Sequence, residues 1–550
     1  MSRPRSGDGG DGAGRPLALA GRVVTMDDGF TVHDDGVVYV RDGEIAAVQD
    51  RDAAAPGGFE EVAAIETNGT IFPGLIELHN HLSYNALQLW DVPKTFTNRD
   101  QWAQGDEYRK LVTGPMKVLA HTPACVQAVV RYVECKCLLG GTTTSQGIAL
   151  SSFSGIQHFY RGIVRNVEEP DDPALRPAAS HIADVDARDR QKFLTRLERL
   201  KCLLLHLSEG TDERARAHFL ALHGDGDDWA IRRSLAGIHC VALKPEDFET
   251  LARHHGSMVW SPLSNLLLYG HTADVKAAKE AGVRLGIGPD WGPSGSKNVL
   301  GELKVARLAS HVAGDVLSDR ELVALATRNA AEVLQWQERA GSLEPGKITD
   351  LLVIDGADGD PYDALFRASE STIALVVIGG VARFGRPDPV NAALGDAADG
   401  AEHVSVGGRS RLVYLHQPTG DPDVGKLTLA EATSILTDAL GKLPELARDL
   451  DSKPALALLE PTPGGTPPMM LVLDHDETLG VDLRPHLPGP DGEPTGELET
   501  VMAAATPLPD LLVPLKLDPL TAVDDSDFAT TLAGERNLPR EIKAGLKELF

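Results

Sequence analysis

The sequence lacks any apolar run long enough to cross a membrane, and it is poor in cysteine and in positive charge. Five cysteines in 550 residues form no dense disulfide framework, so we expect free thiols and a reducing, cytoplasmic location. Lys and Arg number 53 against 80 Asp and Glu, and the net charge of -27 argues against binding to nucleic acid or to anionic membranes. The 42% hydrophobic content is typical of a globular protein, and the length predicts more than one domain.

The two ends of the chain differ in composition from its middle. Residues 1–16 are rich in Gly and Asp without an apolar segment, which predicts a disordered leader and not a signal peptide. Residues 391–550 contain 27 Asp and Glu but 12 Lys and Arg, a net charge of -15. We therefore expect residues 395–550 to form an appended acidic α+β domain of unknown role. Thr428 and Glu431 predict a capping box at the start of one of its helices.

Strand-like runs flank a long alternating region in the middle of the chain. Residues 17–70 are rich in β-branched residues with Asp-Gly turns, and residues 341–390 return to this pattern. Between them, in residues 71–340, short apolar runs alternate with amphipathic helical segments. Eight such runs predict a (β/α)8 TIM barrel, an α/β fold. The seven runs after the first are residues 142–150, 162–168, 177–185, 202–209, 238–243, 257–264 and 283–290.

The first run ends in two histidines, His79 and His81, one residue apart. Side chains alternate along a strand, so these two imidazoles point to the same face. They could bind a metal ion, or they could be two solvated loop histidines. Barrel enzymes carry their chemistry at the C-terminal ends of the strands, so a metal site needs partners at other strand ends. Those ends supply His206 and Glu209 after the fifth run, His239 at the start of the sixth, and Asp290 at the end of the eighth.

The ordered set of segments FPGLIELHNH, HLSEG, HC, SPLSN, GPD and GSLEPGKITDLLVID resembles the metal-dependent amidohydrolase superfamily. It is most similar to the cytosine deaminase-like and chlorohydrolase-like branch. The resemblance covers about residues 17–390, and it implies a barrel with a composite β-sandwich built from residues 17–70 and 341–390. It further implies one divalent metal ion held by His79, His81, His206 and Asp290.

The expected number of metal ions is one, because the fourth run contains no lysine. The branches that bind two metal ions have a carbamylated lysine there as a bridging ligand. Zinc and ferrous iron both suit three imidazoles and a carboxylate, and we favour zinc.

The resemblance also implies the roles of the site residues. The metal would lower the pKa of a water molecule at its open coordination position. Glu209 would transfer protons as a general acid/base, His239 would orient the water or polarise the substrate, and Asp290 would serve catalysis as well as ligation. We therefore predict a hydrolase that cleaves a C–N bond of a small heterocyclic substrate, most simply a deaminase.

Two other functions stay open. The same metal could hydrolyse a cyclic amide or displace another leaving group such as halide. Alternatively, the protein could be a non-catalytic scaffold or binding protein whose acidic tail is the working part. The substrate is not set by the fold, and a homodimer is a common expectation. An arginine that is frequent in the branch is missing from residues 82–96. Residues that could contact the substrate are Tyr84, Asn85, Trp90, Arg165, Asn265 and Trp291.

One motif in the tail indicates a different chemistry. Asp474, Asp476 and Thr478 follow an apolar run and match the first motif of haloacid dehalogenase-like phosphatases. That chemistry needs an aspartyl nucleophile together with a later lysine and further acidic residues. The short remainder of the chain has Pro- and Gly-rich turns where a helix should follow. We therefore expect a strand and a turn with solvated carboxylates here, and no phosphatase site.

Overall fold

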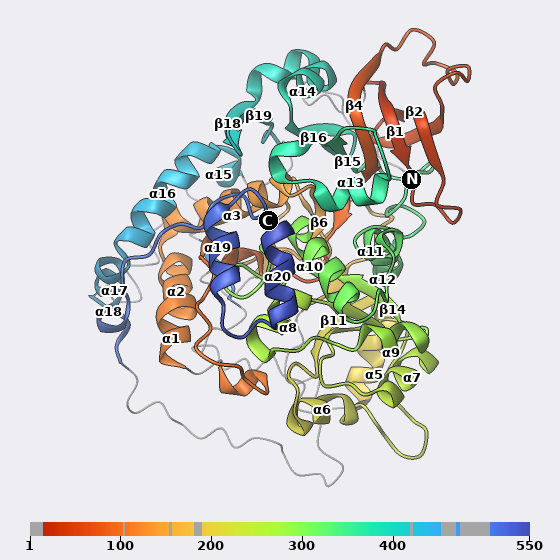
Figure 1. Cartoon of the computed structure of the whole chain (residues 1–550). Coiled ribbons are helices and arrows are strands. Elements are labelled where there is room, and N and C mark those ends of the chain that lie inside the picture. Colours follow the sequence, from red (N-terminus) through yellow and green to blue (C-terminus); the bar gives the residue numbers. More distant parts are fainter. Residues whose placement is uncertain are drawn as a thin grey trace.

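Figure 1 shows the computed structural model of the whole chain. The structure describes residues 15–102, 105–152, 157–180, 190–417, 422–452, 469–473 and 506–549. Most of the expected leader, and the phosphatase-like motif from Asp474 to Thr478, lie outside the described residues. Among the helices in the described ranges, none is both long and apolar enough to cross a membrane.

Eight short strands each lie within, or overlap, one of the eight runs predicted from the sequence. They are β5 (Leu75–Ile76), β6 (Thr142–Ser145), β9 (Arg165–Asn166), β10 (Ala178–Ala179), β11 (Cys202–Leu207), β12 (Leu235–His239), β13 (Ser257–Trp260) and β14 (Arg284–Ile287). All neighbours are parallel, in one sheet of order β5-β6-β9 and another of order β10-β11-β12-β13-β14. Backbone hydrogen bonds connect the edges of the two sheets, from Ala178 N–H to the Val167 carbonyl (2.8 Å) and from Leu78 N–H to the Ile287 carbonyl (3.1 Å). The strands thus succeed one another in chain order, and the last lies beside the first.

Helices lie between most of the strands and after the last one, and they cover the outer side of the strands (Figure 1). They are α3 (Pro123–Leu139), α5 (Arg190–Arg199), α6 (Glu213–Leu220), α7 (Pro245–Arg253), α8 (Pro262–Tyr269), α9 (Val275–Glu280), α10 (Val299–Val312), α11 (Asp319–Leu325) and α12 (Arg328–Leu334). Proline occupies the first turn of α3, α7 and α8, where its missing N–H costs no intrahelical hydrogen bond. The long β5–β6 connection also contains η1 (Leu82–Ala86), η2 (Arg99–Gln101), α1 (Asp106–Tyr108) and α2 (Gly114–His121).

A nine-stranded sheet combines strands from both flanks of the barrel. Its order is β18-β19-β17-β16-β15-β4-β1-β2-β3. The strands are β1 (Leu17–Val24), β2 (Val32–Arg41), β3 (Glu44–Asp50), β4 (Ala64–Pro73), β15 (Leu351–Asp355), β16 (Ile373–Ile378), β17 (Val381–Gly385), β18 (Glu402–Val406) and β19 (Arg409–Val413). Antiparallel pairing of β4 with β15 joins the two flanks. The strands are hydrogen-bonded into one sheet, and the sheet extends beyond the expected boundary at residue 390.

The described residues of the C-terminal segment pack around the barrel. Their elements are α15 (Pro422–Gly425), α16 (Leu429–Gly441), α17 (Leu443–Ser452), β20 (Met469–Leu471), α18 (Leu508–Leu511), α19 (Ser526–Gly534) and α20 (Arg540–Leu549). Helix α16 contacts α3 and α20 contacts α10, as Figure 1 shows. Leu436, Leu532 and Leu546 belong to the same hydrophobic cluster as the apolar residues of α3 and α10. The predicted capping box at Thr428 and Glu431 is present.

Candidate metal centre

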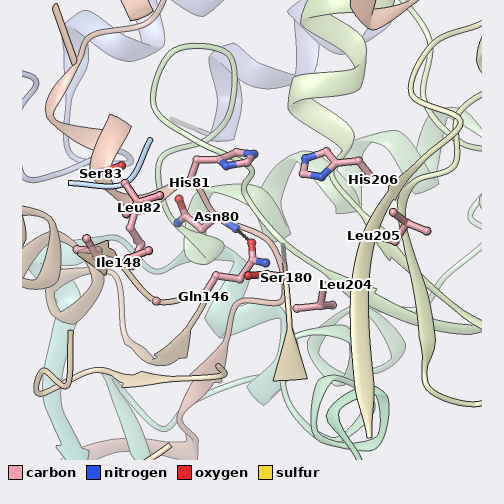
Figure 2. Close-up of a pocket in the computed structure, with 13 residues that line it drawn as sticks. Asn80, His81, Leu82, Ser83, Gln146, Ile148, Ser180, Leu204, Leu205 and His206 are labelled. Carbon is pink, nitrogen blue, oxygen red and sulfur yellow. Dashed lines mark hydrogen bonds between the residues drawn. The ribbon is translucent and has the colours of Figure 1, made fainter. Parts of the chain in front are cut away.

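The structure brings the predicted ligands together at the C-terminal ends of the strands. His79 and His81 follow β5, His206 lies near the end of β11, and Asp290 follows β14. Possible ligand atoms of His79, His81 and His206 lie within 4.8 Å of one another, and so do those of His79, His239 and Asp290. Asp290 Oδ1 is 3.0 Å from His79 Nε2 and 3.6 Å from His81 Nε2. Figure 2 shows the His81 and His206 rings pointing toward each other from their separate strands.

Which ring nitrogen of His79 carries the proton decides whether this side chain can bind a metal ion. His79 Nδ1 lies 3.0 Å from Gln146 Oε1, which also accepts the Asn80 backbone N–H at 2.8 Å. Because Oε1 can only accept, Nδ1 carries the proton and Nε2 is left with its lone pair. Among the described residues, that buried Nε2 has no hydrogen-bond partner that would donate to it, and it faces a carboxylate oxygen. Two lone pairs at this distance repel unless a cation lies between them, so the site fits a divalent metal.

Asp290 is held ionised beside the histidines. Burial raises the pKa of its carboxyl, but positive charge on the histidine side, carried by His79 and the other imidazoles when they are protonated, outweighs burial and holds the pKa well below its ordinary value. A bound metal ion would supply positive charge at the same place. The Ser264 hydroxyl donates to Oδ2 at 2.5 Å, so Oδ1 is the oxygen that faces His79 and His81. Asp290 has φ 67°, a left-handed conformation that is uncommon for a residue with a side chain and that recurs at functional sites.

Strands β14 and β5 approach each other closely at this point. A Cβ on Gly288 would lie 2.5 Å from the His79 backbone nitrogen and from its carbonyl oxygen. Glycine is therefore required here for the Asp290 loop to lie against His79.

Glu209 lies next to the ligands and is held from two sides. Its Oε1 accepts the Tyr269 hydroxyl at 2.8 Å, and its Oε2 is 3.4 Å from Arg99 Nη1 and 3.9 Å from His239 Nε2. The Trp102 indole N–H donates to the Tyr269 oxygen at 2.9 Å, which leaves the tyrosine hydrogen for Glu209. The carboxylate therefore has a fixed position beside His206 and His239.

His239 ends β12, whereas the sequence predicted that it begins the sixth strand. The strand starts earlier, at Leu235, so His239 stands at the C-terminal edge with the other site residues. The Asn265 amide group lies 2.9 Å from His239 Nδ1, and Thr272 donates to the Asn265 oxygen at 3.3 Å. The amide nitrogen thus donates to Nδ1, and the imidazole proton lies on Nε2, the atom that faces Glu209. Burial lowers the pKa of His239 to about 4 and keeps the ring neutral.

The predicted substrate contacts divide into two groups. Tyr84 and Trp291 lie close to the ligands, with ring centroids 6.4 Å and 5.6 Å from that of His81. Trp90 packs on Phe96 and Tyr108 instead.

The other three candidates bind protein groups. Asn85 donates to Asn80 at 3.0 Å, and Asn265 is held by His239. Arg165 is paired with Asp350 and Asp171. It lies in β9, and these carboxylates hold its guanidinium.

Three residues of the site were missed in the sequence. Gln146 directly follows β6, so the strand-end rule that found the histidines could have found it. Arg99 lies just beyond residues 82–96, where the expected arginine is missing, and its partly buried guanidinium reaches Glu209. Tyr269 ends helix α8, where no strand-end signal exists.

A pocket opens beside His81 and His206 (Figure 2). Its cavity volume is about 30 Å³. The lining residues are Asn80, His81, Leu82, Ser83, Gln146, Gly147, Ile148, Ala149, Ser180, Leu204, Leu205, His206 and Val472.

Comparison with known proteins shows which family part of the chain resembles. The sequence model described as Amidohydrolase family matches residues 201–383. The chain contains an amidohydrolase-family domain. The chain is 26% identical over 356 residues to a 5-methylthioadenosine/S-adenosylhomocysteine deaminase of Desulforudis audaxviator, an alignment covering 58% of this chain and 80% of the relative. This confirms the predicted family and the enzyme class, a hydrolase acting on carbon–nitrogen bonds.

Two solved structures share the fold of the amidohydrolase domain. A Xanthomonas campestris adenosine deaminase with bound zinc has a TM-score of 0.52 and 19% identity, covering 70% of this chain and 97% of that chain. An Arthrobacter aurescens atrazine chlorohydrolase complexed with zinc has a TM-score of 0.51 and 20% identity, and the alignment covers 66% of this chain and 94% of that chain. These likenesses support the TIM-barrel fold predicted from the sequence.

Proposed function

We propose that the protein is a metal-dependent hydrolytic deaminase of a small nitrogen heterocycle. The observation that carries this proposal is the position of Glu209. Its carboxylate lies within 4.8 Å of ligand atoms of both His206 and His239, so one acid/base group adjoins both the metal ligands and a second histidine. The curated relative is a deaminase, which supports the same reaction.

His79, His81, His206 and Asp290 would hold the metal, for which we favour a single zinc ion. When bound, the metal supplies a Lewis acid that lowers the pKa of a water molecule toward neutrality. The chain's own contribution is to present Nε2 of His79 and Oδ1 of Asp290 unprotonated. Gln146 does this for His79 by binding the proton on Nδ1, and Ser264 does it for Asp290 by occupying the other oxygen.

Glu209 moves the protons of the reaction. It accepts one proton from the attacking water and gives it to a ring nitrogen, and it then accepts the remaining hydroxyl proton and gives it to the leaving amino group. The water oxygen forms a bond to the amino-bearing carbon, the C–N bond breaks, ammonia leaves and a ring carbonyl remains. Tyr269 and Arg99 keep the Glu209 carboxylate in place during both transfers.

His239 presents a neutral N–H at the reacting centre. Asn265 fixes the tautomer with the proton on Nε2, and a neutral imidazole can donate a hydrogen bond without an added charge. It would orient the attacking water or polarise the substrate.

The test combines metal analysis with ammonia release. We expect about one zinc per wild-type chain, and loss of that metal in His79→Ala and Asp290→Asn while the fold is retained by circular dichroism. His311→Ala is the control, because this exposed histidine pairs only with the nearby Asp315 in the described contacts. Zinc-loaded enzyme should release ammonia from at least one aminopurine, aminopyrimidine or aminotriazine. Absence of bound metal after reconstitution contradicts the metal site, and bound metal without ammonia contradicts the deaminase reaction.

A further inference from the structure

The C-terminal segment reaches the pocket beside the metal centre. Strand β20 pairs antiparallel with β7 (Ala149–Ser152), with Leu471 opposite Leu150, and β7 pairs in turn with β8 (Gln157–Phe159). The pairing continues one residue past β20, because the Val472 N–H donates to the Ala149 carbonyl at 2.9 Å. Strand β7 follows Gln146 closely in the chain, so this contact brings Val472 to the pocket wall.

The direction of the Val472 side chain follows from strand alternation. Leu471 and Leu473 are buried in the main hydrophobic cluster. Successive side chains point to opposite faces, so Val472 faces away from that cluster. It lines the pocket together with His81 and His206, two of the candidate ligands.

Val472 contributes to a wall of mixed polarity around limited free space. The cavity of about 30 Å³ exceeds the roughly 10–15 Å³ that one water needs. Polar groups of Asn80, Ser83 and Gln146 and apolar groups of Ile148 and Val472 share the wall. Asn80, Ser83, Gln146 and Ile148 follow the first two barrel strands, whereas Val472 comes from the C-terminal segment.

We propose that Val472 is a specificity-determining residue that limits the size of the substrate, so that the enzyme takes free heterocyclic bases in preference to their nucleosides. This inference rests on the proposed deaminase function. The branched side chain of Val472 restricts the space next to His81 and His206, and a base with a bulky N-substituent meets it. A difference of one or two methylene-sized groups in such a wall changes relative kcat/KM by about 10–200-fold.

The experiment compares Val472→Ala with Val472→Phe in the zinc-loaded full chain. The substrates are three pairs: adenine and adenosine, cytosine and cytidine, and guanine and guanosine. We expect the wild type to prefer the base of any pair that it uses. Val472→Ala should raise kcat/KM for the nucleoside relative to the base by about 10-fold or more, and Val472→Phe should lower both. Met470→Ala is the matched control, because Met470 is a partly buried residue on the same face of β20 that does not line the pocket.

Equilibrium binding separates this inference from the deaminase proposal. Dissociation constants for the same compounds and variants are measured by calorimetry. If no compound releases ammonia, the deaminase proposal falls, and the ratio of base to nucleoside affinity still tests Val472. A ratio that is equal in wild type and Val472→Ala, in turnover or in binding, overturns the inference. So does the failure of every compound to bind.

Discussion

The ammonium group of Lys297 lies 2.7 Å from the carboxylate of Asp518, and both side chains are buried. Lys297 belongs to the loop that begins with Asp290, and Asp518 belongs to the C-terminal segment. Lys136 of α3 binds the same carboxylate and donates to the Asn85 carbonyl of η1 at 2.9 Å. One carboxylate of the C-terminal segment thus connects the loops that follow the first and last barrel strands, the loops next to His81 and Asp290.

The first prediction is that Asp518 is required for stability. Asp518→Ala leaves two buried lysines without the carboxylate that they share, and removing one partner of a buried ion pair costs about 3–5 kcal/mol. Urea unfolding should show this loss. Asp510→Ala, at an exposed position of α18, is the control and should stay close to the wild type. Equal stability of both variants would mean that the ion pairs contribute little.

The second prediction concerns how Glu209 is held. Tyr269→Phe removes the hydroxyl that donates to Glu209 at 2.8 Å, and hydrogen bonds to charged groups contribute about 1.5–3 kcal/mol. We expect kcat to fall about 10-fold or more while the zinc content is unchanged. Tyr362→Phe is the control, because the Tyr362 hydroxyl is buried without a hydrogen-bond partner among the described residues. Loss of zinc together with activity would instead make Tyr269 a residue that maintains the ligand geometry.

The third prediction concerns the hydroxyl behind Asp290. Ser264→Ala removes the donor to Oδ2 and lets the carboxylate rotate, and loss of such a supporting group typically lowers metal affinity 10–100-fold. Competition with a chelator measures this affinity. Ser257→Ala is a close control, since Ser257 is also buried but its hydroxyl has no partner in the described part of the chain. Equal zinc affinity in both variants would contradict a role for Ser264 in holding Asp290.

Local patterns made the barrel strands and the clustering of the candidate metal ligands predictable. The runs around His79, His206 and Asp290 each combine an apolar strand with a polar residue at its end, and parallel strands in a barrel bring those ends together. His239 was assigned to the wrong end of its strand because Gly237 weakens the strand signal of the preceding residues.

Contacts between distant parts of the chain left no local signal. Arg99 and Tyr269 meet Glu209 from the connections after the first and seventh barrel strands, and neither stands at a strand end. From its amino-acid composition, the C-terminal segment was predicted to be an acidic domain. Its Asp518 carboxylate is instead buried against two lysines of the barrel region, a partnership that only the fold creates.

The last prediction is a pH dependence of stability that arises from Glu302 of α10. This buried carboxyl accepts the Leu263 N–H at 3.1 Å and binds the Ser296 hydroxyl, which connects the loops after β13 and β14. Burial raises the pKa of Glu302 from 4.5 to about 8. Between these values the folded chain keeps a proton that the unfolded chain has released. The free energy of unfolding should therefore decrease as the pH rises through this range, by up to about 1.4 kcal/mol per pH unit from this group.

Glu302→Gln tests this prediction because glutamine resembles the neutral acid and cannot ionise. Urea unfolding at pH 5.5 and pH 7.5 should show a smaller loss of stability with pH in Glu302→Gln than in the wild type. The exposed Glu338 provides the control substitution Glu338→Gln, which should keep the wild-type slope. If Glu302→Gln also keeps that slope, Glu302 is ionised in the folded protein, and its negative charge must be stabilised by the Leu263 N–H and the Ser296 hydroxyl.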